Sequence, residues 1–336
     1  MPNRPPTIRD VARAANVSAA TVSRALSFPD KVSEATRLSV LRAVQETGYA
    51  VNQVARSLRR RTTNTIVVLV PNIGNQFFSR ILAGIEWAAS RAGYTVLISD
   101  TRPLAGGGML MDFVRNNRAD GLISLDGVLP RQILPAAPAG SRTPTLVFAC
   151  EWQDGLGVPS VRFDNEGGAI LAVDHLVSLG HSRIGHLLGP AGNVLTDARL
   201  AGFRTAMAKH ALPIRDDWIL QGDFTLDSGV HAARAWLELA DRPGAMFLAN
   251  DEMAFGFISE LHRHGVEVPR DLSVVAFDDI DIAGRYIPAL TTVRQPRHEI
   301  GEAAFATFLE AFNGDAPEMI RTLPPTLIVR ESTRAA

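Results

Sequence analysis

The pattern of apolar and polar positions divides the chain into two unlike parts. Before about residue 62, apolar side chains recur at helical spacing in short segments that are bounded by residues typical of helix ends. From residue 65 onwards, short runs of consecutive apolar residues alternate with longer amphipathic segments. The first pattern predicts a small helical domain, and the second predicts buried strands that alternate with helices.

Two predicted helices are separated by a tight turn near the start of the chain. Thr7 and Asp10 have the spacing of a capping box, which satisfies the first polar groups of a helix. Residues 16–17 form the turn, and Ser18 is a good N-cap for the second helix. The spacing therefore predicts a helix-turn-helix arrangement over about residues 7–26.

A third helix is predicted after Ser33, which is again a suitable N-cap. Its apolar residues Leu38, Leu41 and Val44 are expected to face the interior, and Gly48 is expected just beyond its end. Three short helices around one small core would form an all-α domain over residues 1–50.

The outward face of the second predicted helix carries small residues and one arginine. These positions are Ala19, Ala20, Thr21, Ser23 and Arg24. In a helix-turn-helix protein the second helix enters the major groove N-terminus first, and an arginine can donate two hydrogen bonds to guanine. Ser18, Thr21 and Ser23 have the right size to contact phosphates or base edges. The alternative is a helical mini-bundle without a role in DNA binding.

Charge is distributed unevenly along the chain. Residues 1–61 contain eleven Lys and Arg against four Asp and Glu, a formal charge of +7, so the other 275 residues carry −8 and the total is −1. A basic segment joined to an acidic body is typical of a module that binds a polyanion and is attached to a module with another function. A solvated basic tail is the alternative interpretation.

Residues 51–62 form an unusual linker, because residues 52–61 contain four arginines, an apolar spine and neither glycine nor proline. Isolated helices of this length are marginal in water, so we expect this segment to become helical on a partner. An apolar wedge flanked by arginines suits insertion into the minor groove. The expected DNA contacts here are Asn52, Ala55, Arg56, Leu58 and Arg59. A flexible basic linker is the alternative.

Strands and helices alternate over residues 63–333. The predicted strands are residues 66–70, 95–98, 121–124, 145–148, 183–187, 218–220, 245–248, 273–276 and 327–330. The alternation resumes after residues 161–163, and the last section begins with residues 291–293. The predicted helices are residues 77–92, 107–117, 166–179, 196–210, 226–239, 251–264 and 299–313. Two runs of this kind predict an α/β core of two doubly wound parallel-sheet lobes. We expect one lobe over residues 63–160 and 291–323, and the other over residues 161–290 and 324–333.

A small molecule would bind between such lobes, because ligands lie beyond the carboxyl ends of parallel strands. Arg199 follows a predicted strand and turn, and its guanidinium suits neighbouring oxygens, with a surface salt bridge as the alternative. Asp278 ends a buried strand and can accept hydroxyl hydrogens. Asn250 and Asp251 follow another strand, although Asp251 can equally cap the next helix.

Aromatic and polar residues near other strand ends are further candidates for this site. Phe77 and Phe78 follow the first strand, so one can stack on a sugar or base while the other packs in the core. Phe224 is a third aromatic candidate, for which packing is an equal alternative. Asp164 can contact ligand or cap a helix, and Gln295 is expected on a crossover between lobes. Arginine, carboxylate and aromatic groups together suit a pentose, a hexose or a nucleoside.

Several other function classes lack support in the sequence. The single cysteine, Cys150, allows neither an internal disulfide nor a multi-cysteine zinc cluster. His175, His181 and His186 have no metal-ligand spacing, and the glycines at residues 106–108 lack the Lys-Ser/Thr of a phosphate-binding loop. We therefore expect no enzyme activity and no cofactor. No apolar run is long enough to span a bilayer and no signal core opens the chain, so we expect a cytoplasmic protein without membrane contact.

Several motifs together resemble the LacI/GalR family of repressors. In the first part these are TIRDVA at residues 7–12, TVSRAL at residues 21–26 and VARSL at residues 54–58. In the body they include RLAGF at residues 199–203 and PALTTVRQP at residues 288–296. The resemblance extends from about residue 7 to about residue 333. Within the family the chain is most similar to the cytidine-repressor type, through GDFT at residues 222–225, DLSV at residues 271–274 and RQPRHEIG at residues 294–301.

The resemblance implies a dimer that binds a palindromic DNA operator. It implies that positions such as Ala19, Ala20 and Arg24 face the major groove, with Thr7 nearby, and that residues 52–60 form a hinge helix whose Leu58 inserts into the minor groove. It also implies a core like that of periplasmic binding proteins, with a small-molecule effector in the cleft between lobes. Since Ala19 and Ala20 are small, we expect weak direct readout and a large contribution from the hinge and from DNA deformability.

The sequence therefore predicts a ligand-responsive DNA-binding transcriptional regulator, with repression as its expected effect. The competing hypothesis is a cytoplasmic sugar- or nucleoside-binding protein, or a sugar-metabolising enzyme, with an accessory basic N-terminal segment. The capped three-helix head argues against that hypothesis.

Overall fold

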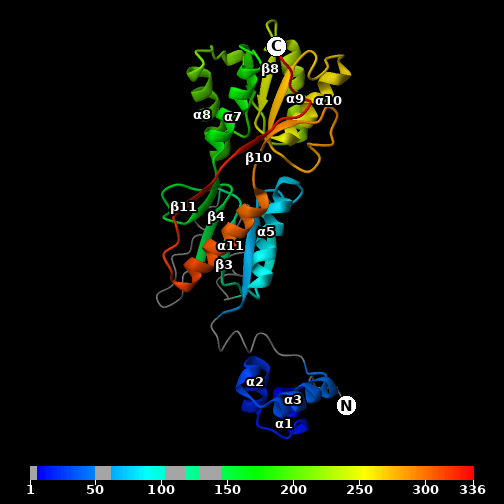
Figure 1. The fold of residues 1–336 in the computed structure, drawn as a ribbon, viewed down its shortest axis with the longest axis vertical. Coiled ribbons are helices and arrows are strands. Elements are labelled where there is room, and N and C mark those ends of the chain that lie inside the picture. The colour runs from blue at the N-terminus through cyan, green and yellow to red at the C-terminus, as the bar shows by residue number, and fades with distance from the viewer. Residues whose placement is uncertain (1–5, 50–61, 103–117, 129–144) are drawn as a thin grey trace. The chain divides into compact units, whose positions relative to one another are not determined.

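The computed structural model describes residues 6–49, 62–102, 118–128 and 145–336 (Figure 1). The chain divides into two compact units, Met1–Thr63 and Asn64–Ala336. The expected hinge segment and the helix expected at residues 107–117 lie outside the described residues. No helix in the described part of the chain combines the length and the apolar character needed to cross a membrane.

The first unit contains three short α-helices, as the sequence predicts. They are α1 (Ile8–Ala14), α2 (Ala19–Ser27) and α3 (Glu34–Thr47), with a 3-10 turn at Pro29–Lys31 between the last two. The predicted caps are present: the backbone N–H and the hydroxyl of Thr7 both donate to Asp10 Oδ2, and Ser18 Oγ accepts from the backbone N–H of Thr21 at 3.0 Å. Gly48 ends α3 in the left-handed conformation.

The interior of this unit differs from the prediction on α3. Leu38 and Leu41 are 55% and 41% exposed, whereas Val40 and Ala43 are buried. The buried residues pack with Val11 and Val22 of the other two helices. Val40 and Ala43 are three residues apart and share one helical face, and their small side chains allow three short helices to approach closely. The prediction that Leu38 and Leu41 face the interior was therefore wrong.

The second unit contains two six-stranded sheets, each the centre of one lobe. The first sheet has the order β11-β5-β4-β3-β1-β2, and its paired strands are parallel. Its strands are β1 (Thr65–Val70), β2 (Thr95–Asp100), β3 (Gly121–Ser124), β4 (Thr145–Ala149), β5 (Ser160–Phe163) and β11 (Ile320–Leu323). Helices α5 (Phe77–Arg91) and α11 (Arg297–Asn313) pack against one another in this lobe (Figure 1).

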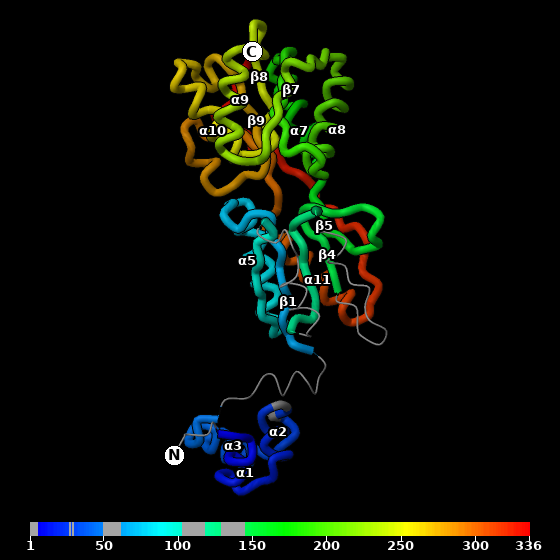
Figure 2. The backbone as a smooth tube through the Cα atoms, turned by 180° about the vertical axis from the view of Figure 1, so that it is seen from behind, coloured from blue at the N-terminus to red at the C-terminus, as the bar shows by residue number. Residues whose placement is uncertain are grey.

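The second sheet has the order β12-β10-β9-β8-β6-β7 and is parallel except at its β12 edge. Its strands are β6 (Ile184–Leu187), β7 (Ile219–Leu220), β8 (Ala245–Leu248), β9 (Ser273–Asp278), β10 (Thr291–Arg294) and β12 (Thr326–Ile328). Helices α7 (Asn165–Ser178) and α8 (Val194–Lys209) lie on one side of it, and α9 (Leu226–Glu238) and α10 (Asp251–Arg263) lie on the other (Figure 2). The doubly wound architecture agrees with the prediction.

The chain crosses between the lobes at three places, and two of them differ from the expected boundaries. We expected the second lobe to begin at residue 161 and the first lobe to resume at residue 291. Strand β5 instead pairs in the first sheet and β10 in the second, so the crossings fall at Asp164, at residues 295–296 and at residues 324–325. The sheet to which a short apolar strand belongs is decided by its pairing partner, which its own sequence does not reveal.

A close crossing of α5 and α11 fixes the start of α11. A Cβ atom at Gly84 would lie 2.1 Å from the carbonyl oxygen of His298, and one at Gly301 would lie 2.1 Å from that of Ile81. Glycine is therefore required on both helices for this approach. The crossing places the N-terminus of α11 beside α5, at the end of the first lobe that adjoins the interlobe crossings.

Candidate functional site

The first unit presents an exposed polar face at the N-terminal half of α2. Ser18, Ala20 and Arg24 are exposed, while Ala19, Thr21 and Ser23 are partly buried. Ser18 and Thr21 share a side-chain hydrogen bond of 2.8 Å, which leaves Arg24 as the long cationic side chain on this face. The other residues expected to contact DNA, Asn52, Ala55, Arg56, Leu58 and Arg59, lie outside the described residues.

The second unit contains a cavity of about 520 Å³ between its two lobes. Six of the nine residues predicted for the effector line it: Phe77, Phe78, Arg199, Phe224, Asn250 and Asp278. Both lobes contribute, because Phe77 and Phe78 begin α5 of the first lobe and the other four belong to the second. The fold therefore brings together residues that are up to 201 positions apart in sequence, at the carboxyl ends of parallel strands.

The other three predicted residues lie outside the cavity lining and have partners in the protein. Asp164 caps α7, where its Oδ1 accepts from the backbone N–H of Gly167 at 2.8 Å. Gln295 lies on a crossing, as expected, and its Nε2 donates to Asp278 Oδ1 at 2.7 Å. Asp251 is fully buried at the start of α10, whose N-cap is Asn250 rather than Asp251.

Arg199 is 2% exposed, and its guanidinium is held by protein groups. Its Nε donates to Asn165 Oδ1 at 2.9 Å, its Nη1 donates to the carbonyl of Ala249, and its Nη2 lies 3.7 Å from Asp278 Oδ1. The guanidinium also stacks over Phe277, 3.9 Å from the ring centre. Burial lowers the pKa of Arg199, and the nearby Asp278 opposes this shift. The alternative of a surface salt bridge is thus wrong, because the side chain is buried in the cavity wall and hydrogen-bonded to Asn165 and Ala249.

Asp278 is the buried carboxylate beside this arginine. Burial raises its pKa to about 6, although Arg199 and the hydrogen bond from Gln295 act in the opposite direction. Its backbone has a φ of +115°, an uncommon value for a residue with a side chain. The carboxylate is therefore held at the cavity wall at a cost in both solvation and backbone conformation.

A hydrogen bond across the cavity joins the lobes through two residues that the sequence did not single out. Glu151 follows β4 of the first lobe and is buried, and its Oε1 accepts from Asn193 Nδ2 at 2.9 Å. Asn193 is the N-cap of α8 in the second lobe. Glu151 Oε2 also accepts from the backbone N–H of Gly127 at 2.9 Å. Burial raises the pKa of Glu151.

Other polar residues of the lining were also missed in the sequence. They are Asn72, Asn75, Thr101, Arg102, Asp126, Asp223, Thr225 and Glu252. Several stand directly after strands β1, β2 and β3, so the signal that could have found them is a polar residue at the end of each buried strand.

The described lining is rich in carboxyl groups. It contains Asp126, Glu151, Asp223, Glu252 and Asp278 against Arg102 and Arg199. Both arginines are paired already, Arg102 with Asp100 at 2.7 Å and Arg199 with Asp278. Acceptor groups beside Phe77, Phe78 and Phe224 suit a ligand that presents hydroxyl or amino hydrogens and an apolar face. Among the described residues, no group of His, Cys, Asp and Glu is arranged to hold a metal ion.

Comparisons with known proteins agree with this architecture. Residues 7–52 match the model of bacterial regulatory proteins of the lacI family, and residues 173–333 match the periplasmic binding protein-like domain. The HTH-type transcriptional repressor CytR of Escherichia coli K12 is 40% identical over 332 residues, covering 98% of this chain and 96% of that protein. The HTH-type transcriptional repressor PurR of Vibrio parahaemolyticus is 36% identical over 336 residues, covering 98% of each.

Solved structures give the same result. The Lac repressor dimer bound to operator and an anti-inducer superposes with a TM-score of 0.86 at 32% identity, covering 99% of this chain and 100% of that one. The transcriptional regulator CelR in complex with cellobiose superposes with a TM-score of 0.73 at 32% identity, covering 97% and 99%. With relatives of this identity along nearly the whole chain, the protein belongs to the LacI family of bacterial regulatory proteins.

Proposed function

We propose that the protein is a ligand-responsive transcriptional repressor that binds a palindromic operator as a dimer. The observation that carries the proposal is the union of two features in one chain: a capped helix-turn-helix unit with an exposed Arg24, and a two-lobed unit with a polar interlobe cavity. Repressors that are 35–40% identical and a Lac repressor dimer bound to operator support it. In this proposal the protein acts as a binding protein in the cytoplasm, on the nucleoid, because its partner there is DNA.

The DNA-binding surface consists of Thr7, the N-terminal half of α2 and residues 52–59. Arg24 contacts a guanine edge, and Ser18, Thr21 and Ser23 contact phosphates or base edges. Ala19 and Ala20 contribute apolar contacts, while Leu58 and the neighbouring arginines bind the minor groove. The basic charge of residues 1–61 supplies the attraction to phosphate and makes binding salt-dependent.

The effector is a small nucleoside, sugar or similar polyol in the interlobe cavity. Asp278, Asn250 and the other carboxyl groups of the lining accept its hydroxyl or amino hydrogens, and the rings of Phe77, Phe78 and Phe224 contact its apolar face. The structure of CelR with cellobiose provides a precedent for a ligand of this chemistry. A ligand that binds one arrangement of the lobes more tightly shifts the protein toward that arrangement and thereby changes its affinity for DNA.

Two measurements test the proposal. Selection from randomised palindromic duplexes with the full chain should yield one enriched sequence, whose affinity is then measured by fluorescence anisotropy. A thermal-shift panel of cytidine, adenosine, uridine and D-ribose should give at least one stabilising compound. Removal of residues 1–61 should abolish DNA binding and preserve the thermal shift. Absence of any sequence preference in the intact chain would refute the proposal.

A further inference from the structure

Asp251 was predicted to contact the effector or to cap α10, and the structure gives it neither position. Asn250 is the N-cap of α10, since its side chain accepts from the backbone N–H of Met253. Asp251 itself is 0% exposed and lies behind the cavity wall. A fully buried carboxylate is costly unless protein groups satisfy it, so the groups that it binds indicate its purpose.

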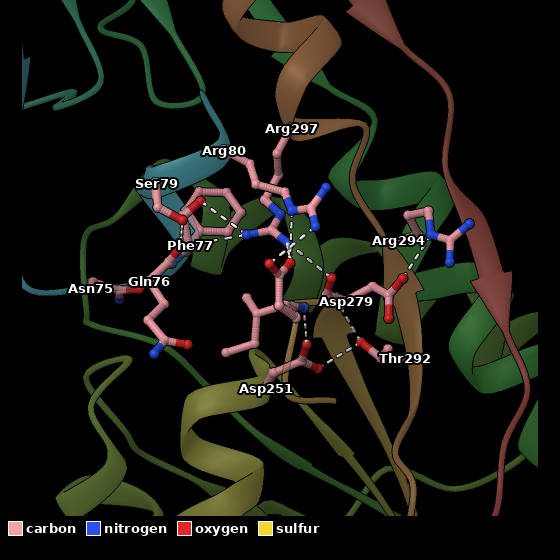
Figure 3. Close-up of polar contacts among 12 residues, drawn as sticks. Asn75, Gln76, Phe77, Ser79, Arg80, Asp251, Asp279, Thr292, Arg294 and Arg297 are labelled. Carbon is pink, nitrogen blue, oxygen red and sulfur yellow. Dashed lines mark hydrogen bonds and ion pairs between the residues drawn. The ribbon is translucent and has the colours of Figure 1, made fainter. Parts of the chain in front are cut away.

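Both oxygens of Asp251 are used on neighbouring elements (Figure 3). Oδ2 accepts from the backbone N–H of Ile280 at 2.8 Å, and Oδ1 accepts from the hydroxyl of Thr292 on β10 at 2.6 Å. Asp251 thus connects the start of α10 to β10 and to the turn after β9. We call residues 278–281, which run from the last residue of β9 into this turn, the coupling segment.

The coupling segment has a conformation that needs support. Its first two residues, Asp278 and Asp279, have φ values of +115° and +51°, which residues with side chains seldom adopt. The hydrogen bond to Asp251 holds the next residue, Ile280, immediately after this strained pair. Asp251 is therefore placed to fix the path of the turn.

The two ends of the coupling segment have different environments. Asp278 at one end lines the effector cavity. Three residues later, Asp281 accepts a bidentate pair of hydrogen bonds from Arg80 on α5, at 2.7 and 3.0 Å. Arg297 at the start of α11 also donates to Asp281, at 3.2 Å. Since α5 and α11 belong to the first lobe, the segment connects the cavity carboxylate to the opposite lobe.

Arg297 also contacts a residue that lines the cavity. Its guanidinium is 4% exposed and donates to the carbonyl oxygens of Phe77 at 3.3 Å and of Asp279 at 3.1 Å (Figure 3). Phe77 lines the effector cavity from the first lobe. Movement of Asp278 and movement of Phe77 are thus both linked to the same buried guanidinium.

We propose that Asp251 is a positioning residue that holds the coupling segment in the form that joins the cavity to the first lobe. Binding of an effector in the cavity then changes the arrangement of the two lobes through Asp278, Asp281 and the arginines that bind Asp281. The proposal rests on the function proposed above. It predicts that Asp251 and Asp281 determine how strongly an effector changes operator affinity, although neither residue lines the cavity.

Amide hydrogen exchange of the full chain tests the role of Asp251 without DNA or effector. In Asp251→Ala the amide of Ile280 loses its acceptor and should exchange at least about tenfold faster. Asp251→Asn should stay within about twofold of the wild type, because an amide can accept from Ile280 and donate to Thr292 Oγ1. This rescue also fits the environment, since burial and Asp278 raise the pKa of Asp251 well above its ordinary value. Asp174→Ala, which removes a paired carboxylate elsewhere in the same lobe, should leave this amide unchanged.

The second readout is the ratio of the larger to the smaller of two operator affinities, one measured with and one without the panel compound that gives the largest thermal shift. Asp281→Ala should reduce this ratio at least fivefold while the affinity of the compound itself changes less than about threefold, and Asp251→Ala should also reduce the ratio. Asp251→Asn and Asp174→Ala should retain it. Unchanged Ile280 exchange in Asp251→Ala, or an unchanged ratio in Asp281→Ala, would overturn the proposal. Failure of the wild type to bind any selected duplex would instead refute the repressor assignment, and the exchange comparison would still decide the role of Asp251.

Discussion

Replacing Arg199 with Met tests whether the buried guanidinium holds the cavity wall together. Met retains an apolar stem over Phe277 and removes the hydrogen bonds to Asn165 and to the Ala249 carbonyl. It also leaves the 5% exposed carboxylate of Asp278 without its cation. Breaking a buried ion pair from one side costs about 3–5 kcal/mol, and we expect a loss in this range from the free energy of unfolding.

Urea unfolding of the full chain, followed by tryptophan fluorescence, measures this loss, because Trp218 and Trp236 are buried in the same lobe. Arg270→Met is the matched control: Arg270 is 56% exposed and pairs with exposed Glu267 and Asp271, so its loss should cost less than about 1 kcal/mol. The double variant Arg199→Met with Asp278→Asn should be more stable than Arg199→Met alone, since the uncompensated charge is gone. A cost below about 1 kcal/mol for Arg199→Met, or further loss in the double variant, would refute the reasoning.

Three further predictions concern Asp278, the DNA-binding residues and the crossing of α5 and α11. Because burial raises the pKa of Asp278 to about 6, its contribution to stability is fully present below the ordinary pKa of an unfolded aspartate and is lost as the pH rises through 6. From pH 4 to 7 the wild type should lose about 2 kcal/mol more than Asp278→Asn in urea unfolding, and equal losses would contradict this. Arg24→Ala should weaken binding to the selected operator by about 1–3 kcal/mol in anisotropy titrations, and Leu58→Ala should weaken it about as much; unchanged affinity in Leu58→Ala would exclude the hinge contact. In urea unfolding, Gly84→Ala should cost about 1–3 kcal/mol of stability, because the new Cβ would lie 2.1 Å from the carbonyl oxygen of His298. Gly244→Ala is the control and should cost far less, because the nearest atom to its new Cβ would lie at 4.0 Å.

Local signals in the sequence located most elements of the fold. The caps at Thr7, Ser18 and Ser33 depend on hydrogen bonds within three residues, so short-range spacing was sufficient to place α1, α2 and α3. The alternation of buried strands and helices likewise predicted two doubly wound lobes correctly. Strand β11 (Ile320–Leu323) was missed because it is a largely exposed edge strand without an apolar run.

The candidate site was only partly predictable, for a different physical reason. Arg199 and Asp278 stand at strand ends within recognisable motifs, and both line the cavity. Glu151 and Asn193 are ordinary polar residues in sequence, and only the packing of the two lobes brings them within 2.9 Å. Asp251 adjoins a lining residue but lies behind the cavity wall, because the orientation of successive residues at a helix start depends on the backbone there.

The central claim is that one chain couples a small-molecule cavity to a DNA-reading helix. The most direct test is to titrate the selected palindromic duplex with the full chain, with and without the panel compound that gives the largest thermal shift. The account predicts one sequence-specific affinity that the compound changes at least fivefold and that Asp281→Ala makes insensitive to the compound. Sequence-specific binding that no stabilising compound alters would contradict the claim.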